Sequence, residues 1–522
     1  MLIGDISRRN ADFFGDREAL VEPGGRVRTW LEVEERTNRM ARALLDLGLG
    51  KGDRLAMFSV NCVEYVEFFF ACAKSGVVGS PMNVRLAPPE NVKYANYAEP
   101  RAVLVHASLV EEARAWIAET PSIEMVIGFG GEHDLDLDLE AIAAASSGDV
   151  SSVVLTPDDP YMLCPTSGTT GVSKGALMTQ GNAISGIFGW LADYPVNEGD
   201  TNLQCIPQYL NAGGPAHIHP VFTKGGRSVI LPGFDPLGFL QSVDRYRVTH
   251  TTAVPTMISM VLDHQERPAY DLSSLRVIVL GGSPVAAPLV VRVRSEIGDC
   301  LYPTLGMAET YSCGLVLRPQ NQHPDGSLEE IRRLGSLGKP HTHLQVRIVG
   351  ADGKDVPHDN TTHGEIWFKG GSVSPEYFRM PEETAAARVE GWLRTGDVAV
   401  IDDDGYVTVV DRLKDIIISG GYNVASGEVE SVLCEHPAVA EAAVIGTPHD
   451  TWGEAVHAVI VRRPAQDVTE QELIEFAGAR LAGYKRPRSV IFVSALPRNP
   501  TGKVLKRELR ATYRDQGSLS DA

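Results

Sequence analysis

The sequence contains no uninterrupted hydrophobic run long enough to cross a bilayer, which takes about 20 apolar residues. Its most apolar stretch, residues 63–83, carries two glutamates and a lysine, and this pattern predicts a buried helix followed by a strand. The first ten residues, MLIGDISRRN, lack the apolar core of a signal peptide. We therefore expect a cytoplasmic protein without membrane insertion.

Positive charge and clustered cysteines are also scarce. The 48 lysines and arginines stand against 67 aspartates and glutamates, a formal net charge of −19. Such acidity disfavours nucleic acid and anionic membranes as partners, so any phosphate site must be a local positive pocket. The 7 cysteines are scattered, with no CxxC pair and no Cys/His spacing typical of zinc sites. This pattern argues against a disulfide framework or a structural zinc and predicts reduced, buried thiols.

One short stretch is rich in glycine and hydroxyl residues: positions 164–176 read CPTSGTTGVSKGA. Glycines let the backbone curl so that successive N–H groups point to one place, and short hydroxyls add donors. Lys174 adds a positive charge, so the stretch predicts a phosphate-binding loop, with a solvated linker as the alternative. A Walker loop ends in Gly-Lys-Ser/Thr, whereas Lys174 precedes Gly175, which disfavours an ordinary P-loop NTPase.

Helical and strand patterns alternate along most of the chain, which is typical of parallel sheets covered by helices. Helices are predicted over 31–47 and 63–74, and strands over 54–60, 102–107, 228–233, 276–282, 346–350 and 365–370. The acidic residues 134–152 are interpreted as a surface connection. From about residue 411 the pattern changes to a helix near Gly427 and strands over 440–446 and 456–463, a small α+β unit with the length of a separate domain.

Five motifs follow one another in a fixed order: SGTTGVSKG, GGSPV (281–285), LGMAET (305–310), the segment 391–430 and PRNPTGKVLKREL (497–509). This set resembles the adenylate-forming superfamily of acyl-CoA synthetases, peptide-synthetase adenylation domains and firefly luciferase, in its acyl-CoA ligase branch. The resemblance implies an α/β fold. A large N-terminal domain of mixed and parallel sheets sandwiched by helices would span residues 1–413. A small mobile α+β domain would span 414–522, with its hinge at Lys414.

The resemblance also implies a two-step reaction. A carboxylic acid attacks the α-phosphate of ATP to give an acyl-adenylate, and after the small domain swings, the thiol of coenzyme A attacks the adenylate. ATP or an acyl-adenylate, Mg²⁺ and coenzyme A would therefore bind, and the partners would be a small-molecule carboxylic acid and CoA.

Individual roles come from the same resemblance. The phosphate loop would comprise Thr166, Ser167, Gly168, Thr169, Thr170, Gly171 and Lys174. The AMP-binding residues would be Gly281, Gly282, Ser283, Gly306, Asp397 and Arg412. Glu309 matches the acidic residue associated with Mg²⁺, and Lys503 matches the catalytic lysine that bridges the carboxylate and the α-phosphate. The pantetheine tunnel would be bordered by Ser419, Gly420, Gly421 and Tyr422.

Four positions depart from the family pattern. Leu305 replaces an aromatic residue, Ala308 replaces a threonine that holds the AMP phosphate, and Gln180 and Leu210 each stand where a histidine is usual. Each lost hydrogen bond to a charged phosphate is worth ~1.5–3 kcal/mol, or about ten- to a hundredfold in rate or affinity. A complete two-step ligase is the favoured interpretation. The alternative performs only thioesterification, on an acyl-adenylate supplied by a partner adenylating enzyme.

The acid is predicted from a segment rich in apolar and small residues. Tyr209, Leu210, Gly213, Gly214 and Met307 would line a roomy pocket for a bulky hydrophobic acid. No acidic residue between 205 and 216 could pair with an α-ammonium group, which argues against an amino acid. His217 and His219 would be structural, on opposite faces of an extended segment. A luciferase-like oxygenase and a non-catalytic binder remain as alternative functions.

Overall fold

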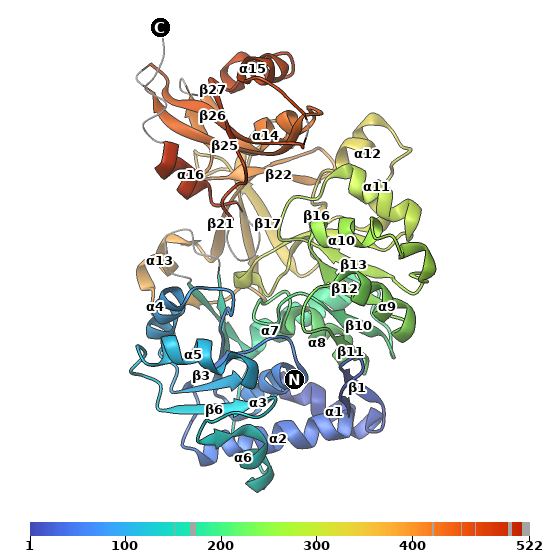
Figure 1. The fold of residues 1–522 in the computed structure, drawn as a ribbon, viewed down its shortest axis with the longest axis vertical. Coiled ribbons are helices and arrows are strands. Elements are labelled where there is room, and N and C mark those ends of the chain that lie inside the picture. The colour runs from blue at the N-terminus through green and yellow to red at the C-terminus, as the bar shows by residue number, and fades with distance from the viewer. Residues whose placement is uncertain are drawn as a thin grey trace. The chain divides into compact units, whose positions relative to one another are not determined.

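A computed structural model describes residues 1–150, 152–166, 174–419, 422–449, 451–464, 466–498 and 504–513 (Figure 1). The chain divides into two compact units. Unit 1 comprises Met1–Val346 and Phe368–Leu393, and unit 2 comprises Arg347–Trp367 and Arg394–Ala522. The boundary predicted between residues 413 and 414 comes from motifs rather than from compactness, and it stays a prediction.

An eight-stranded sheet in unit 1 has the order β19-β9-β8-β4-β3-β5-β6-β7. Strands β4, β3, β5 and β6 pair in parallel, as the alternation of strand and helix patterns predicts, whereas β8 and β9 form an antiparallel pair. In sheet order the strands span Glu376–Tyr377, Gly175–Thr179, Pro160–Pro165, Val78–Pro81, Arg54–Phe58, Ala102–His106, Met125–Phe129 and Leu137–Asp138.

Helix α3 (Val63–Ser75) lies in the main core of unit 1, and all of its residues are buried. Its acidic side chains are paired, for example Glu67 Oε1 with Arg36 Nε at 2.6 Å, so burial does not leave an isolated charge. The neighbouring helix α2 begins with a capping box in which Thr29 and Glu32 satisfy each other's backbone N–H groups. Helices in this part of the unit are α1 (Gly4–Phe14), α2 (Trp30–Asp46), α4 (Pro88–Ala98), α5 (Val110–Ile117), α6 (Leu139–Ala145) and α13 (Pro381–Ala386).

A nine-stranded sheet forms the rest of unit 1, in the order β16-β15-β14-β13-β12-β10-β11-β1-β2. In that order the strands span Lys339–Pro340, Gly314–Val316, Leu301–Gly306, Val277–Leu280, His250–Ala253, Thr201–Gln204, Arg227–Ile230, Glu18–Val21 and Val27–Thr29. The strands from β14 to β11 pair in parallel, and a second hydrophobic core lies against them. The accompanying helices are α7 (Gln180–Asp193), α8 (Pro215–Thr223), α9 (Pro236–Tyr246), α10 (Pro255–Leu262), α11 (Ala287–Glu296) and α12 (Leu328–Arg333).

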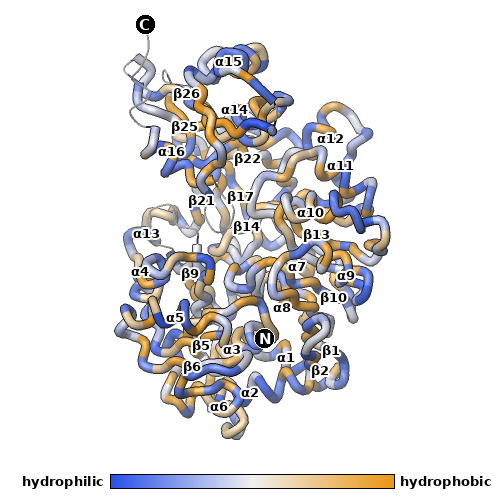
Figure 2. Tube along the Cα trace, in the orientation of Figure 1, coloured by the Kyte–Doolittle hydropathy of each residue, from blue (hydrophilic) through white to orange (hydrophobic). Residues whose placement is uncertain are grey.

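Unit 2 contains a five-stranded sheet in which β24 (Tyr422–Val424), β23 (Ile417–Ser419), β26 (Gly453–Arg462) and β25 (Val439–His449) follow one another and β27 (Ser489–Val493) pairs with β26. Figure 2 shows hydrophobic residues along β25 and β26, which pack with α14 (Ser426–Cys434) and α15 (Glu470–Gly478) around a core of their own. Helix α16 spans Lys506–Tyr513. The remaining strands are β17 (Leu344–Val349), β18 (Gly364–Gly370), β20 (Arg388–Val389), β21 (Trp392–Ile401) and β22 (Val407–Arg412), and the division between the units falls within β17, β18 and β21.

The predicted α/β fold class is confirmed, and the predicted helices and strands match observed elements to within a few residues. Two segments differ from the prediction. Residues 134–152, interpreted as a connection, contain β7 and α6, because Asp138 accepts a hydrogen bond from Ala141 N at 2.8 Å and so caps a short helix. The segment of His217 and His219, interpreted as extended, lies in α8, with Pro215 at the first turn of that helix.

None of the helices within the described ranges combines the length and the apolar character that a membrane span requires. Six of the cysteines are buried and Cys434 is exposed.

Candidate active site

Two antiparallel strands form the neck of the predicted phosphate loop. Strands β8 and β9 pair with Pro165 opposite Gly175, and Thr166 N donates to Lys174 O at 2.8 Å. Thr166 and Lys174 therefore face each other where the loop leaves the sheet. The other predicted members of the loop, Ser167, Gly168, Thr169, Thr170 and Gly171, lie outside the described residues.

A tyrosine and an acid lie beside this neck. Tyr377 belongs to β19, which pairs with β9, and the Nζ of Lys174 lies 5.0 Å from the centroid of its ring. The hydroxyl of Tyr377 donates to Oε1 of Glu309 at 2.7 Å. Lys174, Tyr377 and Glu309 thus form one connected group. The sequence predicted Lys174 and Glu309 as site residues but not Tyr377. The position of Tyr377 depends on a strand pairing that no local motif indicates.

Glu309 is buried, with only 6% of its surface exposed, in the 3₁₀ turn η3 (Ala308–Thr310) directly after β14. A buried carboxylate is costly unless it is paired, and the Tyr377 hydroxyl supplies one hydrogen bond. Burial, followed by the negative charge of Glu309, raises the pKa of Tyr377, so the phenol keeps its proton and remains a donor. Arg388, also missed from sequence, donates to Ser374 O, and burial lowers the pKa of its guanidinium against the opposing charge of Glu309.

This donor set fits a magnesium ion that arrives with a nucleotide. Mg²⁺ takes oxygen ligands and is commonly held by one or two carboxylates together with phosphate oxygens of the substrate. Glu309 offers a carboxylate beside the neck of the predicted phosphate loop, and Lys174 places a positive charge at the same neck. The remaining oxygens would have to come from the triphosphate and from water.

The predicted AMP-binding glycines meet at one edge of the nine-stranded sheet. Gly281, Gly282 and Ser283 follow β13, while Gly306 ends β14, its parallel neighbour. Ligands of parallel sheets bind outside the carboxyl ends of the strands, which is where these residues lie. Two of the glycines are explained without any ligand. A Cβ on Gly306 would lie 2.1 Å from Ser312 O, and Gly282 has a φ of +81°, a conformation that other residues rarely adopt.

Four of the five residues predicted to line the acyl pocket lie just before α8, and Met307 follows β14. Tyr209 is buried, and Leu210 packs against the main core of unit 1. A Cβ on Gly213 would lie 2.0 Å from Pro207 O, and one on Gly214 would lie 2.6 Å from Gln208 O. Close approach of the backbone therefore explains both glycines, and it leaves their role in a pocket, with that of Met307, as a prediction.

The two histidines of α8 are buried, and each lies within hydrogen-bonding distance of a neighbouring side chain. His217 Nδ1 lies 2.5 Å from Thr252 Oγ1, and His219 Nδ1 lies 3.0 Å from Tyr311 OH. Burial lowers the pKa of both imidazoles to about 3, so they are neutral at physiological pH. This environment supports the predicted structural role, although the segment is helical rather than extended.

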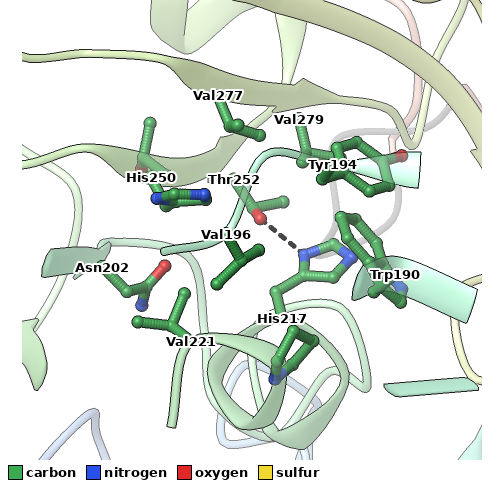
Figure 3. A pocket seen from close by; sticks show the side chains of 12 residues that line it. Trp190, Tyr194, Val196, Asn202, His217, Val221, His250, Thr252, Val277 and Val279 are labelled. Carbon is green, nitrogen blue, oxygen red and sulfur yellow. Dashed lines mark hydrogen bonds between the residues drawn. The ribbon is translucent and has the colours of Figure 1, made fainter. Parts of the chain in front are cut away.

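A cavity of about 20 Å³ lies beside His217, large enough for one water molecule (Figure 3). It lies between α7, α8 and strands β10, β12 and β13, with a lining that is mostly apolar and aromatic. Prominent among its walls are Trp190, Tyr194, Val221, His250, Val277 and Val279. Its size excludes an acyl chain in this conformation.

The departure at Gln180 has a packing explanation. Gln180 is fully buried at the first turn of α7, where its Oε1 accepts from Ile3 N at 3.1 Å and its Nε2 donates to Ala73 O at 2.9 Å. The amide thus joins α7 to the N-terminal segment and to the end of α3. A histidine could not make both of these contacts in the same way, because its neutral ring offers a different geometry.

In unit 2, two predicted AMP-binding residues are directly paired. Asp397 on β21 lies opposite Arg412 on β22, and Arg412 Nε is 2.7 Å from Asp397 Oδ1. Asp397 is 3% exposed, whereas Arg412 is exposed. The ion pair holds the carboxylate in one orientation, as a group that accepts hydrogen bonds from a diol requires.

The predicted hinge, Lys414, is exposed in a turn whose two ends are fixed. On one side Asp411 accepts from Ser426 Oγ at 2.6 Å at the start of α14, and on the other Asp415 pairs with Arg510 of α16 at 2.6 Å. Hydrogen bonds from Asp415 N and Ile416 N to Arg412 O close the turn. The exposed residue thus lies between two anchored positions.

Among the predicted CoA-binding residues, Ser419 is buried and pairs with Tyr422 across β23 and β24. Tyr422 is 60% exposed and its ring stacks on Tyr484, with centroids 4.7 Å apart. Tyr484 was not predicted from sequence. Gly420, Gly421 and the catalytic candidate Lys503 lie outside the described residues.

Comparison with known proteins agrees with this arrangement. The family model described as AMP-binding enzyme matches residues 7–378, and the model of the AMP-binding enzyme C-terminal domain matches residues 428–503. A feruloyl-CoA synthase of Amycolatopsis sp is 35% identical over 493 residues, 94% of this chain and 95% of that protein.

Two further similar proteins extend the comparison. The long-chain-fatty-acid–CoA ligase FadD13 of Mycobacterium tuberculosis (strain ATCC 25618 / H37Rv) is 35% identical over 515 residues, 98% of each chain. The solved structure of ATP-bound MatB from Rhodopseudomonas palustris has a TM-score of 0.86 at 30% identity and covers 99% of this chain and 100% of that one.

Proposed function

The chain belongs to the family of AMP-binding enzymes, in the acyl-CoA ligase branch of the adenylate-forming superfamily, and we propose that it converts a bulky hydrophobic carboxylic acid into its CoA thioester. One observation carries the proposal beyond the family assignment. Glu309, Tyr377 and Lys174 form a connected group at the neck of the β8–β9 loop, on the part of the chain that would receive the triphosphate.

In the first step, a carboxylate oxygen of the acid attacks the α-phosphorus of ATP, and the bond from that phosphorus to the bridging oxygen of pyrophosphate breaks. Thr166 and Lys174 would position the phosphates, and the buried Glu309, held by Tyr377, would hold Mg²⁺. When bound, that ion neutralises phosphate charge. Lys503 would bridge the carboxylate and the α-phosphate, where a cation stabilises the charge that develops.

In the second step, the thiol sulfur of CoA attacks the acyl carbon, the carbon–oxygen bond to AMP breaks and the thiol proton is released. Rotation about Lys414 would bring the segment of Ser419 and Tyr422 to the adenylate. Such a rotation would have to break the hydrogen bond from Ser426 Oγ to Asp411, because it joins residues on the two sides of Lys414, whereas Asp415 and Arg510 would move together.

The acid is proposed to be bulky and hydrophobic. Two similar ligases are named for acids of this kind, the feruloyl and long-chain fatty acids. In this chain no acidic side chain between Cys205 and Ala216 could pair with an α-ammonium group. Ligands of this class bind in apolar pockets with few polar groups.

Adenylation by ATP is retained in this proposal. Thioesterification alone is not favoured, because the two similar proteins are named as a CoA synthase and a CoA ligase and because Gln180, one of the departures, has a packing role. Leu305 and Ala308 would then weaken the grip on AMP without abolishing the reaction.

Two assays on one panel of acids test the proposal: ATP–pyrophosphate exchange, and CoA-thioester formation from synthetic acyl-adenylates. The panel should include cinnamic-type acids, medium- and long-chain fatty acids, and amino acids as negative controls. We expect bulky hydrophobic acids to support both reactions. Thioester formation without exchange would show that adenylation is lost, and preference for a short or charged acid would refute the proposed substrate class.

A further inference from the structure

Three potential metal ligands meet in unit 1, and none of them belongs to the group of Lys174, Tyr377 and Glu309. The Sγ of Cys313 and one ring nitrogen each of His341 and His343 all lie within 4.8 Å of one another. Cys313 and His341 are buried, and His343 is partly buried. The sequence shows no zinc-like spacing here, because the cysteine and the histidine pair are far apart along the chain.

Strand pairing brings these residues together. Cys313 immediately precedes β15 and His341 immediately follows β16, and the two strands pair in antiparallel fashion with Leu315 opposite Pro340. His341 N donates to Gly314 O at 2.9 Å, which fixes the two side chains at the same end of the pair. The grouping therefore depends on backbone hydrogen bonds and not on flexible side chains alone.

Helix α7 packs against the same group of residues. The ring of His343 packs directly on Gly189, where a Cβ would lie 2.0 Å from Nδ1. Asp193, at the end of the same helix, pairs with Arg318 and accepts hydrogen bonds from Thr342 N at 2.8 Å and Thr342 Oγ1 at 2.7 Å. The residue between the two histidines is thus anchored, so both imidazoles are held in place before any ion binds.

Each imidazole has one nitrogen engaged and one without a partner. Nε2 of His341 lies 3.2 Å from Tyr194 OH, and Nε2 of His343 lies 2.9 Å from Ser372 Oγ. Nδ1 of each ring is buried and makes no hydrogen bond to any part of the chain that the structure describes. A buried polar atom without a partner is costly, and ligating histidines characteristically use their second nitrogen for a hydrogen bond of this kind.

The chemical character of the three groups selects the ion. A thiolate and two imidazoles suit a borderline-soft cation such as Zn²⁺, whereas Mg²⁺ and Ca²⁺ require oxygen ligands.

We propose that Cys313, His341 and His343 form a buried three-ligand site for Zn²⁺, with the fourth position taken by a water molecule. Binding forms one Zn–S and two Zn–N bonds, displaces water from the hydrated ion and releases the thiol proton to solvent. Zn–S and Zn–N bonds of about 2.3 and 2.0 Å place tetrahedral ligand atoms about 3.5 Å apart, so no pair of ligand atoms has to approach by more than about 1.5 Å.

A bound ion would restrict the movement of the segment that carries Glu309. Cys313 and Glu309 lie in the same short connection between β14 and β15, and no element separates them except the end of η3. Zn²⁺ on Cys313 would tie this connection to the end of β16. The site would therefore act as a structural staple for the neighbouring active-site segment, independent of the acid that the enzyme uses.

Cobalt(II) titration of the tag-free, full-length protein, first dialysed against a chelator, tests the proposal. We expect one equivalent of Co²⁺ to give a thiolate-to-cobalt charge-transfer absorption together with the intense visible bands of a tetrahedral site. One equivalent of Zn²⁺ should abolish both and raise the midpoint of thermal unfolding. Binding of neither ion by the wild-type protein would overturn the proposal without recourse to any variant.

Matched variants locate the site. Cys313→Ser should eliminate the charge-transfer absorption, and His343→Asn should weaken cobalt binding by at least about tenfold. Cys434→Ser, at the exposed cysteine, should leave the spectrum unchanged and serves as the control. Far-UV circular dichroism establishes that each variant is folded. A charge-transfer absorption that persists in Cys313→Ser, or disappears in Cys434→Ser, would contradict the assignment.

Discussion

Units 1 and 2 hold their predicted site residues in contrasting ways. In unit 1, Glu309 is buried and hydrogen-bonded to Tyr377, and Gly306 packs against Ser312 O. In unit 2, Lys414 and Tyr422 are exposed on turns or edge strands, whereas Asp397 and Ser419 are buried. The contrast teaches that a sequence motif identifies a functional residue but does not predict whether its side chain is buried and held by packing or exposed to solvent.

The largest effect is expected from unit 2. Lys503→Ala removes the cation proposed to bridge the carboxylate and the α-phosphate, and we expect ATP–pyrophosphate exchange to fall by about 10³-fold. Thioester formation from a supplied acyl-adenylate should fall by much less, because that step does not need the bridge. Steady-state rates of the two half-reactions measure the difference.

Lys506→Ala is the matched control for this variant. Lys506 pairs with Glu430 at 2.7 Å and therefore has a structural partner. We expect its removal to lower stability, because Glu430 is largely buried, but to leave the exchange rate of the folded protein within about threefold of the wild type, because Lys506 has no proposed contact with the substrates. Equal losses in both half-reactions for Lys503→Ala would argue against a role limited to adenylation.

A smaller loss is expected from the buried acid of unit 1. Glu309→Gln keeps the size of the side chain and an oxygen that can accept from Tyr377, but it removes the charge proposed to hold Mg²⁺. We expect exchange to fall about 10²-fold and to recover partly at high Mg²⁺ concentration, since weaker binding can be offset by mass action. A Mg²⁺ titration of the exchange rate checks this, with Tyr377→Phe as a milder companion.

Sequence alone predicted the α/β fold and a minority of the strands, those formed by hydrophobic runs, because such runs separated by helical patterns are local signals. It also named Lys174 and Glu309 from their motifs. It missed Tyr377 and Arg388, which reach the site through the pairing of β19 with β9 and through the fold of the following segment. It also failed to group Cys313 with His341 and His343, since that grouping follows from the register of β15 and β16.

Acid should destabilise unit 1 through its buried histidines. Burial lowers the pKa of His217 and His219 to about 3, against 6.5 for an exposed imidazole. Above pH 6.5 neither the folded nor the unfolded state binds these protons. As the pH falls below 6.5 the unfolded state takes them up first, so the free energy of unfolding decreases, by about 2 kcal/mol per histidine at pH 5.

Urea denaturation at several pH values measures this effect, with Trp30, Trp116 and Trp190 reporting on unit 1. His219→Gln should reduce the loss of stability between pH 7 and pH 5 by about 2 kcal/mol. Between pH 7 and pH 8 the difference between the variant and the wild type should stay constant. An unchanged slope below pH 6.5 would mean that His219 takes up a proton equally in both states.

The smallest effect is expected where unit 2 presents its surface. Tyr422 stacks on Tyr484 with an interplanar angle of 26° and is largely exposed, so its removal exposes little apolar surface to water. We expect Tyr422→Ala to lower the free energy of unfolding by less than about 1 kcal/mol, and to raise the KM for CoA a few-fold while the KM for ATP is unchanged. Tyr484→Ala is the companion variant. If the two stacked rings together form one side of the CoA site, either substitution should raise the KM for CoA by the same factor. The double variant should then raise it little further. If instead both single variants leave the KM for CoA unaltered, the exposed ring is only a surface contact and the role proposed for Tyr422 is wrong.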